Sequence, residues 1–143
     1  MQTLEQFYWG TPSADLFEAI ESLELDEAKV TRAICEAVIE ADAENVPALM
    51  VLAELYTKSG EHERGLDLDL RLRRLTPESP IVWYNLGCSY SLLGETRASL
   101  ESLQRALELG YKDVNFMKRD PDLQAVRSDP GFAEILAAFT PRE

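Results

Sequence analysis

The chain has 143 residues, enough for one domain, and its hydrophobic fraction of 45% is ordinary for a folded protein. Its net charge of −12 repels phosphate backbones and anionic lipids, which makes nucleic acid and membranes poor partners. We expect no secretory signal, because the start of the chain has no basic end and no apolar core. The two cysteines, Cys35 and Cys88, fall in predicted helix interiors, so we expect free thiols and cytoplasmic residence.

The negative charge is concentrated near the N-terminus. Residues 1–44 hold eleven acidic and two basic residues, whereas residues 45–143 hold fifteen acidic and twelve basic ones. A well-solvated surface accounts for this imbalance. The alternative is an acidic front that attracts a basic segment of a partner.

Helix starts are marked by a capping residue directly before a proline. The side-chain oxygen of such a residue accepts a hydrogen bond from a free amide of the first turn, where proline has no amide to leave unpaired. The pairs are Thr11-Pro12, Ser79-Pro80, Asp120-Pro121 and Asp129-Pro130, with Asn45-Val46-Pro47 as a looser version. Gly60 and Gly94 fall where one helix must stop and the chain must reverse.

These signals predict an all-α chain. In chain order we expect an aromatic segment at Phe7, Tyr8 and Trp9, which packs as a lid over the first helix pair, and then a helix over about 12–24. The remaining predicted helices are 26–42, the pair 46–59 and 61–75, the pair 80–93 and 95–109, and three short helices near 113–119, 121–128 and 130–139.

The spacing of apolar residues supports two of these helices. One face of the first carries Leu49, Leu52, Ala53 and Tyr56, and the same face of the second carries Trp83, Leu86, Gly87 and Tyr90. The small residue in each set, alanine or glycine, lets a neighbouring helix approach closely. Residues 66–72 alternate like a strand, but they lie between the breakers Gly60 and Pro77, and that context and length favour a helix.

The two helix pairs repeat each other at a spacing of 34 residues. The equivalent positions include Tyr56 and Tyr90, Gly60 and Gly94, Glu61 and Glu95, Leu66 and Leu100, and Leu75 and Leu109. A fixed period of this length indicates stacked helix pairs. Asp69 falls where the repeat calls for a bulky apolar residue, so either the helix is rotated there or the carboxylate finds a partner.

The run Trp83-x-x-Leu86-Gly87-x-x-Tyr90, followed by Gly94, Leu103 and Ala106, resembles the tetratricopeptide repeat family. The resemblance implies a right-handed solenoid of antiparallel helix pairs, of a small bacterial type. It is strongest over 80–109, good over 46–77 and weak before residue 45. We therefore expect a single domain, 1–143, made of a degenerate repeat (1–45), two repeats (46–79 and 80–113) and C-terminal capping helices (114–143), which hide the last apolar face.

The resemblance also implies a non-enzymatic adaptor that binds a peptide or helix in a groove lined by the first helix of each pair. Lysines of a carboxylate-binding clamp are missing, since the corresponding positions hold Leu16, Ile20 and Met50. We expect an apolar or basic protein segment as partner, or a second copy of the chain in a homodimer. Asn85 matches an asparagine that bonds ligand backbone, or is simply exposed, and Tyr84 is expected to project into the groove. The candidate groove residues are Met50, Glu54, Thr57, Ile81, Tyr84, Asn85, Cys88 and Ser91.

The residues predict no catalytic, metal or cofactor site. His62 is the single histidine, and we expect it to be exposed in a turn, without further ligands at metal-binding spacing. Cys88 has no neighbouring base that would activate it, so a small packed thiol is the expected role. Acidic pairs such as Glu61 and Glu63 are not isolated in an apolar cleft, as acid–base catalysis requires.

Overall fold

The computed structural model describes residues 26–140, which belong to two compact units, residues 1–34 and 35–143. The aromatic segment Phe7–Trp9, the predicted helix 12–24 and the cap Thr11 lie outside the described residues. The described part of the first unit is the start of helix α3 (Glu27–Ala41), where Lys29 pairs with Asp26 at 3.4 Å. None of the helices between residues 26 and 140 is long and apolar enough to cross a membrane.

The second unit contains the rest of α3 and a succession of helices. Every helix predicted from residue 26 onward is confirmed with ends within about two residues, although the segment predicted at 121–128 is divided into a 3₁₀ turn and a short helix. The elements are α4 (Val46–Lys58), α5 (His62–Leu75), α6 (Pro80–Leu92), α7 (Thr96–Glu108), α8 (Val114–Met117), η1 (Pro121–Leu123), α9 (Gln124–Arg127) and α10 (Pro130–Phe139).

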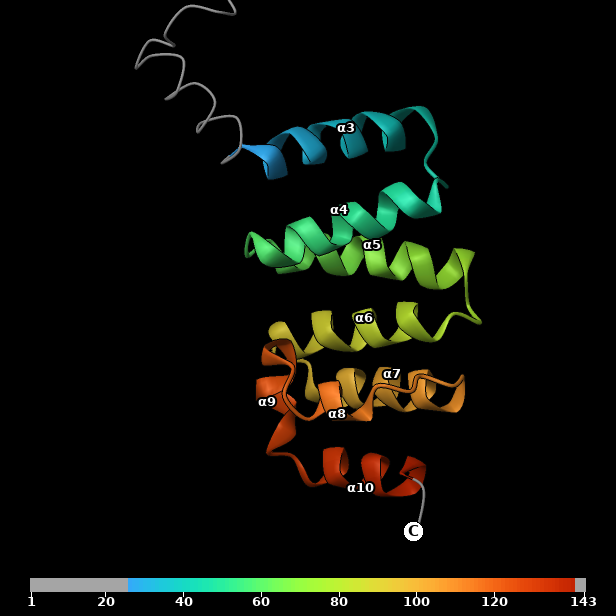
Figure 1. Ribbon diagram of the computed structural model, residues 1–143, viewed down its shortest axis with the longest axis vertical. Coiled ribbons are helices and arrows are strands. Elements are labelled where there is room, and N and C mark those ends of the chain that lie inside the picture. The colour runs from blue at the N-terminus through green and yellow to red at the C-terminus, as the bar shows by residue number, and fades with distance from the viewer. Residues whose placement is uncertain (1–25, 141–143) are drawn as a thin grey trace, which may run out of the picture. The chain divides into compact units, whose positions relative to one another are not determined.

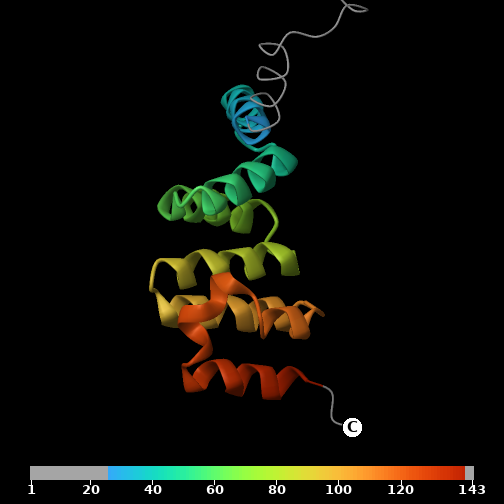
Figure 2. The ribbon, with the colours of Figure 1, turned by 60° about the vertical axis from the view of Figure 1, so that its left-hand side comes forward.

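Within this unit the helices pack as successive pairs (Figures 1 and 2). Helix α4 packs on α5, α5 on α6, and α6 on α7. The chain then returns: η1 and α9 pack on α6, and α10 packs on α7. The described residues contain no strand, so the predicted all-α arrangement of antiparallel helix pairs is confirmed.

The predicted apolar face is buried throughout on α4, whereas on α6 only Leu86 and Gly87 of that face are buried and Trp83 and Tyr90 are half-buried. Leu49, Leu52, Ala53 and Tyr56 are all at most 7% exposed, and Leu86 is fully buried. Trp83 is only half-buried: its indole N–H donates to the main-chain oxygen of Pro77 over 2.8 Å, with the Arg73 guanidinium 5.7 Å from the ring centre.

A close contact between α6 and α7 explains the glycine of the repeat. A Cβ atom on Gly87 would lie 2.7 Å from a methyl carbon of Leu103 and 3.3 Å from the main-chain oxygen of Ser99. The Ser99 hydroxyl instead donates to the Gly87 carbonyl over 2.7 Å. The expectation that a small residue allows close helix approach is confirmed here.

The turns follow the predicted chemistry with one exception. Gly60 and Gly94 have φ angles of +83° and +77°, which favour glycine. Side chains of Asn45, Asp120 and Asp129 accept amide hydrogen bonds at the starts of α4, η1 and α10.

The predicted cap at Ser79 is wrong, because its hydroxyl accepts no amide of α6. The turn before α6 is held by the main chain instead, where the Ser79 amide donates to the Thr76 oxygen over 3.1 Å. The Trp83 indole, bonded to Pro77, closes the same turn from the helix side. The main-chain hydrogen bond and the Trp83 indole therefore hold this turn in place of the expected serine cap.

Candidate partner-binding pocket

A pocket of about 470 Å³ opens between the first helices of the two pairs and the segment that follows α7. We call it the α4–α6 pocket. Helix α4 contributes Met50, Val51, Ala53, Glu54, Thr57 and Lys58, and helix α5 contributes Asp69. Helix α6 contributes Ile81, Tyr84, Asn85, Cys88 and Ser89, and the segment 111–122 contributes Tyr111, Phe116, Asp120 and Asp122. Its volume is in the range of small-molecule and peptide side-chain sites.

Seven of the eight residues predicted to line a groove lie around this one pocket, and Ser91 does not. Ser91 is 1% exposed, and its hydroxyl oxygen has no hydrogen-bond partner among the described residues. The prediction for Ser91 is therefore wrong, because its side chain is buried and does not line the pocket. Binding of a partner by the other seven stays a prediction.

Tyr84 is also placed differently from the prediction, because it is buried at 3% exposure. Its ring stacks on Tyr111, with centres 4.2 Å apart and planes 5° from parallel, and Phe116 lies 6.4 Å away at a tilt. Its hydroxyl donates to a carboxylate oxygen of Asp120 over 2.6 Å. The segment after α7 thus covers the part of α6 that the sequence suggested was free.

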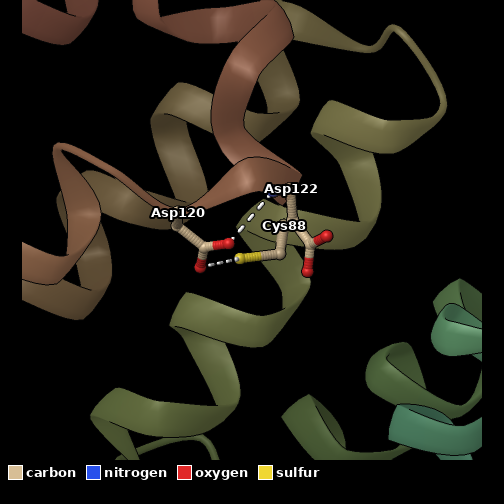
Figure 3. Close-up of side chains that lie close together, drawn as sticks. All are labelled: Cys88, Asp120 and Asp122. Carbon is tan, nitrogen blue, oxygen red and sulfur yellow. Dashed lines mark hydrogen bonds between the residues drawn. The ribbon is translucent and has the colours of Figure 1, made fainter.

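Asp120 is the centre of a small polar cluster (Figure 3). One carboxylate oxygen accepts hydrogen bonds from the Tyr84 hydroxyl and from the Cys88 thiol, the latter at 3.8 Å. The other oxygen accepts the backbone amide of Asp122 over 3.0 Å, as the cap of η1. The Arg127 guanidinium donates to the main-chain oxygen of Asp120 over 2.6 Å. Hydrogen bonds to Asp120 therefore connect residues of α6, η1 and α9 in one cluster.

Cys88, Asp120 and Asp122 place three potential metal ligands within 4.8 Å of one another. A cysteine binds metal as the thiolate. Burial, and the nearby charges of Asp120 and Asp122, raise the pKa of the Cys88 thiol far above its usual value. The Cys88 thiol therefore stays protonated, and its S–H group donates a hydrogen bond to the Asp120 carboxylate.

Asp69 is the other buried carboxylate of the pocket, at 2% exposure. The sequence left open whether α5 is rotated there or the carboxylate has a partner, and the structure shows the second. The Ser89 hydroxyl of α6 donates to it over 2.5 Å. Burial raises the pKa of Asp69 to about 6, and the serine hydrogen bond opposes that rise.

His62 does not occupy the exposed position expected of it. It is the first residue of α5 and half-buried, and its Nδ1 atom is buried without a hydrogen-bond partner among residues 26–140. Burial and the charge of Asp120 raise the pKa of Asp122, and the charge of His62 opposes that rise. The histidine therefore lies close enough to the C-terminal segment to act on it electrostatically.

Several lining residues were missed by sequence reasoning. Asp120 was identified only as a helix cap, Phe116 and Asp122 only fall within the predicted cap 114–143, and Tyr111 only falls at the end of the predicted repeat 80–113. Their position against α6 results from a return of the chain across the stack, for which local patterns give no signal. Asp69 did carry a signal, since it interrupts the apolar period of the repeat.

The comparisons agree with the repeat pattern. Residues 81–109 match the family model described as the tetratricopeptide repeat. The chain is similar to a chloroplastic protein from Arabidopsis thaliana, with 33% identity over 87 residues, which is 59% of this chain and 26% of that protein. It is also similar to Anaphase-promoting complex subunit 3 from Dictyostelium discoideum, with 29% identity over 80 residues, 56% of this chain and 8% of that protein. The matches therefore cover only a minor part of each of these relatives.

Proposed function

This chain is a tetratricopeptide repeat protein, and from that premise we propose that it is a non-enzymatic adaptor whose α4–α6 pocket binds a segment of a partner protein. Stacked repeats of this kind are generally protein-interaction modules. The proposal takes the chain as one functional domain, with 46–79 and 80–113 as its repeats, 1–45 as a divergent start and 114–143 as a cap.

The observation that carries this proposal is the apolar rim of the pocket. Val51 and Ile81 are each 41% exposed, and Phe116 is 36% exposed. They come from α4, α6 and α8, yet they surround one opening. Exposed apolar side chains gathered around a hollow are typical of a surface that becomes covered by another chain.

Polar groups at the pocket support recognition of a peptide backbone. The Asn85 amide is half-buried in the lining and makes no hydrogen bond to another described residue. An amide carries both donors and an acceptor, so it can bind the N–H and C=O of an extended segment at once. The neighbouring apolar side chains exclude water from such bonds, which strengthens them.

The charges of the lining favour an apolar or basic segment. Glu54, Asp69, Asp120 and Asp122 face the pocket together with a single base, Lys58. The lysine is already paired with Glu54 at 2.8 Å. An acidic partner segment would meet net repulsion here, whereas a basic one would be attracted.

The experiment compares capture of partners by the protein and by rim variants. Ile81→Ser and Val51→Ser remove apolar rim side chains, and Phe139→Ser removes one of similar exposure on α10, away from the pocket. We expect partners captured from a lysate of the source cells, identified by mass spectrometry, to be lost with the rim variants and kept with Phe139→Ser. Circular dichroism controls for helicity.

Equal capture by all three variants would contradict the proposal. Analytical ultracentrifugation across a dilution series tests the alternative that the apolar rim joins two copies of this chain. A concentration-dependent dimer that Ile81→Ser dissociates would replace the adaptor with a self-associating structural protein.

A further inference from the structure

Two adjacent residues of α6 hold two buried carboxylates that come from distant parts of the chain. The Ser89 hydroxyl donates to Asp69 of α5, and the Cys88 thiol donates to Asp120 just before η1. Asp69 is 2% exposed and Asp120 is 5% exposed, yet both line the α4–α6 pocket. Asp122 lines the same pocket, and Figure 3 shows its carboxylate near the Cys88 thiol and the Asp120 carboxylate, with the potential ligand atoms of the three residues within 4.8 Å of one another.

Among the described residues none of these three carboxylates forms a salt bridge, although the charge of His62 acts on Asp122. Asp69 is bound by a hydroxyl, and the Asp120 carboxylate by a hydroxyl, a thiol and a backbone amide. Arg127 reaches the main-chain oxygen of Asp120 and not its carboxylate, and no salt bridge includes Asp122. Lys58, the basic residue of the pocket lining, is paired with Glu54 at 2.8 Å.

Asp69 is a costly residue at its position. The residue 34 positions later, Leu103, is fully buried in the core of the second repeat, as the period requires. A carboxylate buried in the equivalent place loses its hydration, and a single serine hydroxyl offsets the free-energy cost of that loss only in part. A buried residue that breaks the apolar pattern of the repeat, and whose contact inside the chain offsets its burial only in part, is a candidate for binding a ligand.

We propose that Asp69, with Asp122 adding negative charge, forms a subsite for one cationic side chain of the partner segment, a lysine or an arginine. This inference rests on the proposed function, because the segment must first enter the α4–α6 pocket. The flexible hydrocarbon part of the cationic side chain lies along apolar walls while its charged end reaches Asp69. Neighbouring residues of the segment contact the apolar rim at Val51, Ile81 and Phe116.

A peptide is the occupant that fits both features of the pocket. A small amine or a metal ion would satisfy the carboxylates and leave the exposed apolar rim uncovered. A wholly apolar peptide would cover the rim and leave Asp69 buried deeper with no counter-charge, which is unfavourable. A basic residue flanked by apolar ones satisfies both requirements.

The test uses displayed random twelve-residue peptides selected on the immobilised full chain. We expect the enriched sequences to share one lysine or arginine between apolar residues. In parallel selections, Asp69→Asn should lose the preference for the basic residue and keep the apolar positions. The matched control is Asp67→Asn, the same change two residues earlier on α5, where the side chain is exposed and paired with Arg71.

Three outcomes separate this inference from the function on which it rests. Enrichment of apolar sequences without a basic residue would sustain the pocket and overturn the cationic subsite. The same basic preference on Asp69→Asn as on the natural chain would also overturn it. Failure to enrich any sequence would count against the proposed function itself, and the inference would fall with it.

Fluorescence anisotropy with the most enriched peptide then measures how much each substitution weakens peptide binding. We expect Asp69→Asn to weaken binding of the basic peptide by about ten-fold or more, and Asp122→Asn by a smaller factor. A peptide in which methionine replaces the basic residue should bind the natural chain and Asp69→Asn alike. Asparagine keeps an acceptor for Ser89, and a thermal melt of each variant verifies folding.

A metal-bridged contact is the competing explanation, and the same measurement decides it. Binding of the basic peptide should be unchanged by EDTA and by added Zn²⁺ or Ca²⁺. Loss of binding with EDTA, restored by either ion, would overturn the direct pairing of the cationic side chain with Asp69.

Discussion

The Tyr84 hydroxyl donates a hydrogen bond of 2.6 Å to the Asp120 carboxylate, joining residues 36 positions apart. The bond fastens the segment after α7 to the middle of α6, where the stacked ring of Tyr111 adds apolar contact. The C-terminal segment therefore does more than hide the last helix face. It also forms one wall of the α4–α6 pocket and supplies two of its carboxylates.

The first prediction concerns this bond. Tyr84→Phe keeps the ring stack but leaves the buried Asp120 carboxylate without its hydroxyl donor. We expect a loss of about 1–3 kcal/mol in the free energy of unfolding, measured by urea titration. Tyr90→Phe, on the same helix and half-buried, is the control and should change stability by less. Equal effects of the two variants would show that the hydrogen bond to Asp120 adds nothing.

The second prediction concerns the close approach of α6 and α7. Alanine normally stabilises a helix relative to glycine by about 0.5–1 kcal/mol. Gly87→Ala should do the opposite and destabilise by about 1–3 kcal/mol, because its methyl group would meet Leu103 at 2.7 Å.

Gly65→Ala is the comparison for this variant, because the nearest atom to its methyl group would be the Thr57 side-chain oxygen at 3.0 Å, and the next ones lie at 3.5 Å or more. We expect it to cost less than Gly87→Ala in the same urea titration. A more stable Gly87→Ala protein would mean that the two helices separate without loss.

The third prediction is a pH dependence that Asp69 contributes. Its pKa is raised by burial from 3.8 to about 6 in the folded chain. The neutral form is favoured by folding, so the stability it contributes is fully present below pH 3.8 and is lost as the pH rises to about 6. A shift of roughly two units corresponds to about 3 kcal/mol at most.

Asp69→Asn removes this titration, since its amide stays neutral. We expect the variant to match the natural chain near pH 4 and to exceed it in stability above pH 6, measured by urea unfolding at each pH. Asp67→Asn should follow the natural chain throughout. A constant difference between Asp69→Asn and the natural chain across this range would contradict the assigned pKa.

The fourth prediction concerns thiol chemistry. Cys88 is 6% exposed and its pKa is raised, so almost no thiolate is available near pH 8. We expect iodoacetamide to label it at least about ten-fold more slowly in the folded protein than in urea, as followed by mass spectrometry of its peptide. Rapid labelling under native conditions would show that the cluster around Asp120 opens readily.

Much of the fold was predictable because its signals are local. Proline after a cap, glycine at a reversal and apolar residues three or four positions apart each act within one helix or turn. The strand-like alternation of 66–72 was correctly overruled by the breakers at Gly60 and Pro77, and these residues lie in α5. Ser79 shows the limit of such rules, since its backbone and Trp83 hold the turn without its side chain.

The candidate pocket was predictable on one side only. The positions on α4 and α6 follow from helical periodicity, and seven of the eight predicted residues line it. The burial of Tyr84 was not foreseen, because it depends on Tyr111 and Asp120 of a segment that leaves α7 and returns across α6. Nothing within a few residues of Tyr84 encodes that contact.

The sequence by itself determined the helices, their pairing and the apolar stripes that join them, because each of these depends on neighbours within one or two turns. Only the tertiary structure decided which residues of α6 stay accessible and which carboxylates meet around them. That outcome depends on contacts between residues 20 to 36 positions apart, such as Ser89 with Asp69 and Tyr84 with Asp120. Such contacts form only when the whole stack is assembled, since packing of the last segment, and not local propensity, brings the partners together.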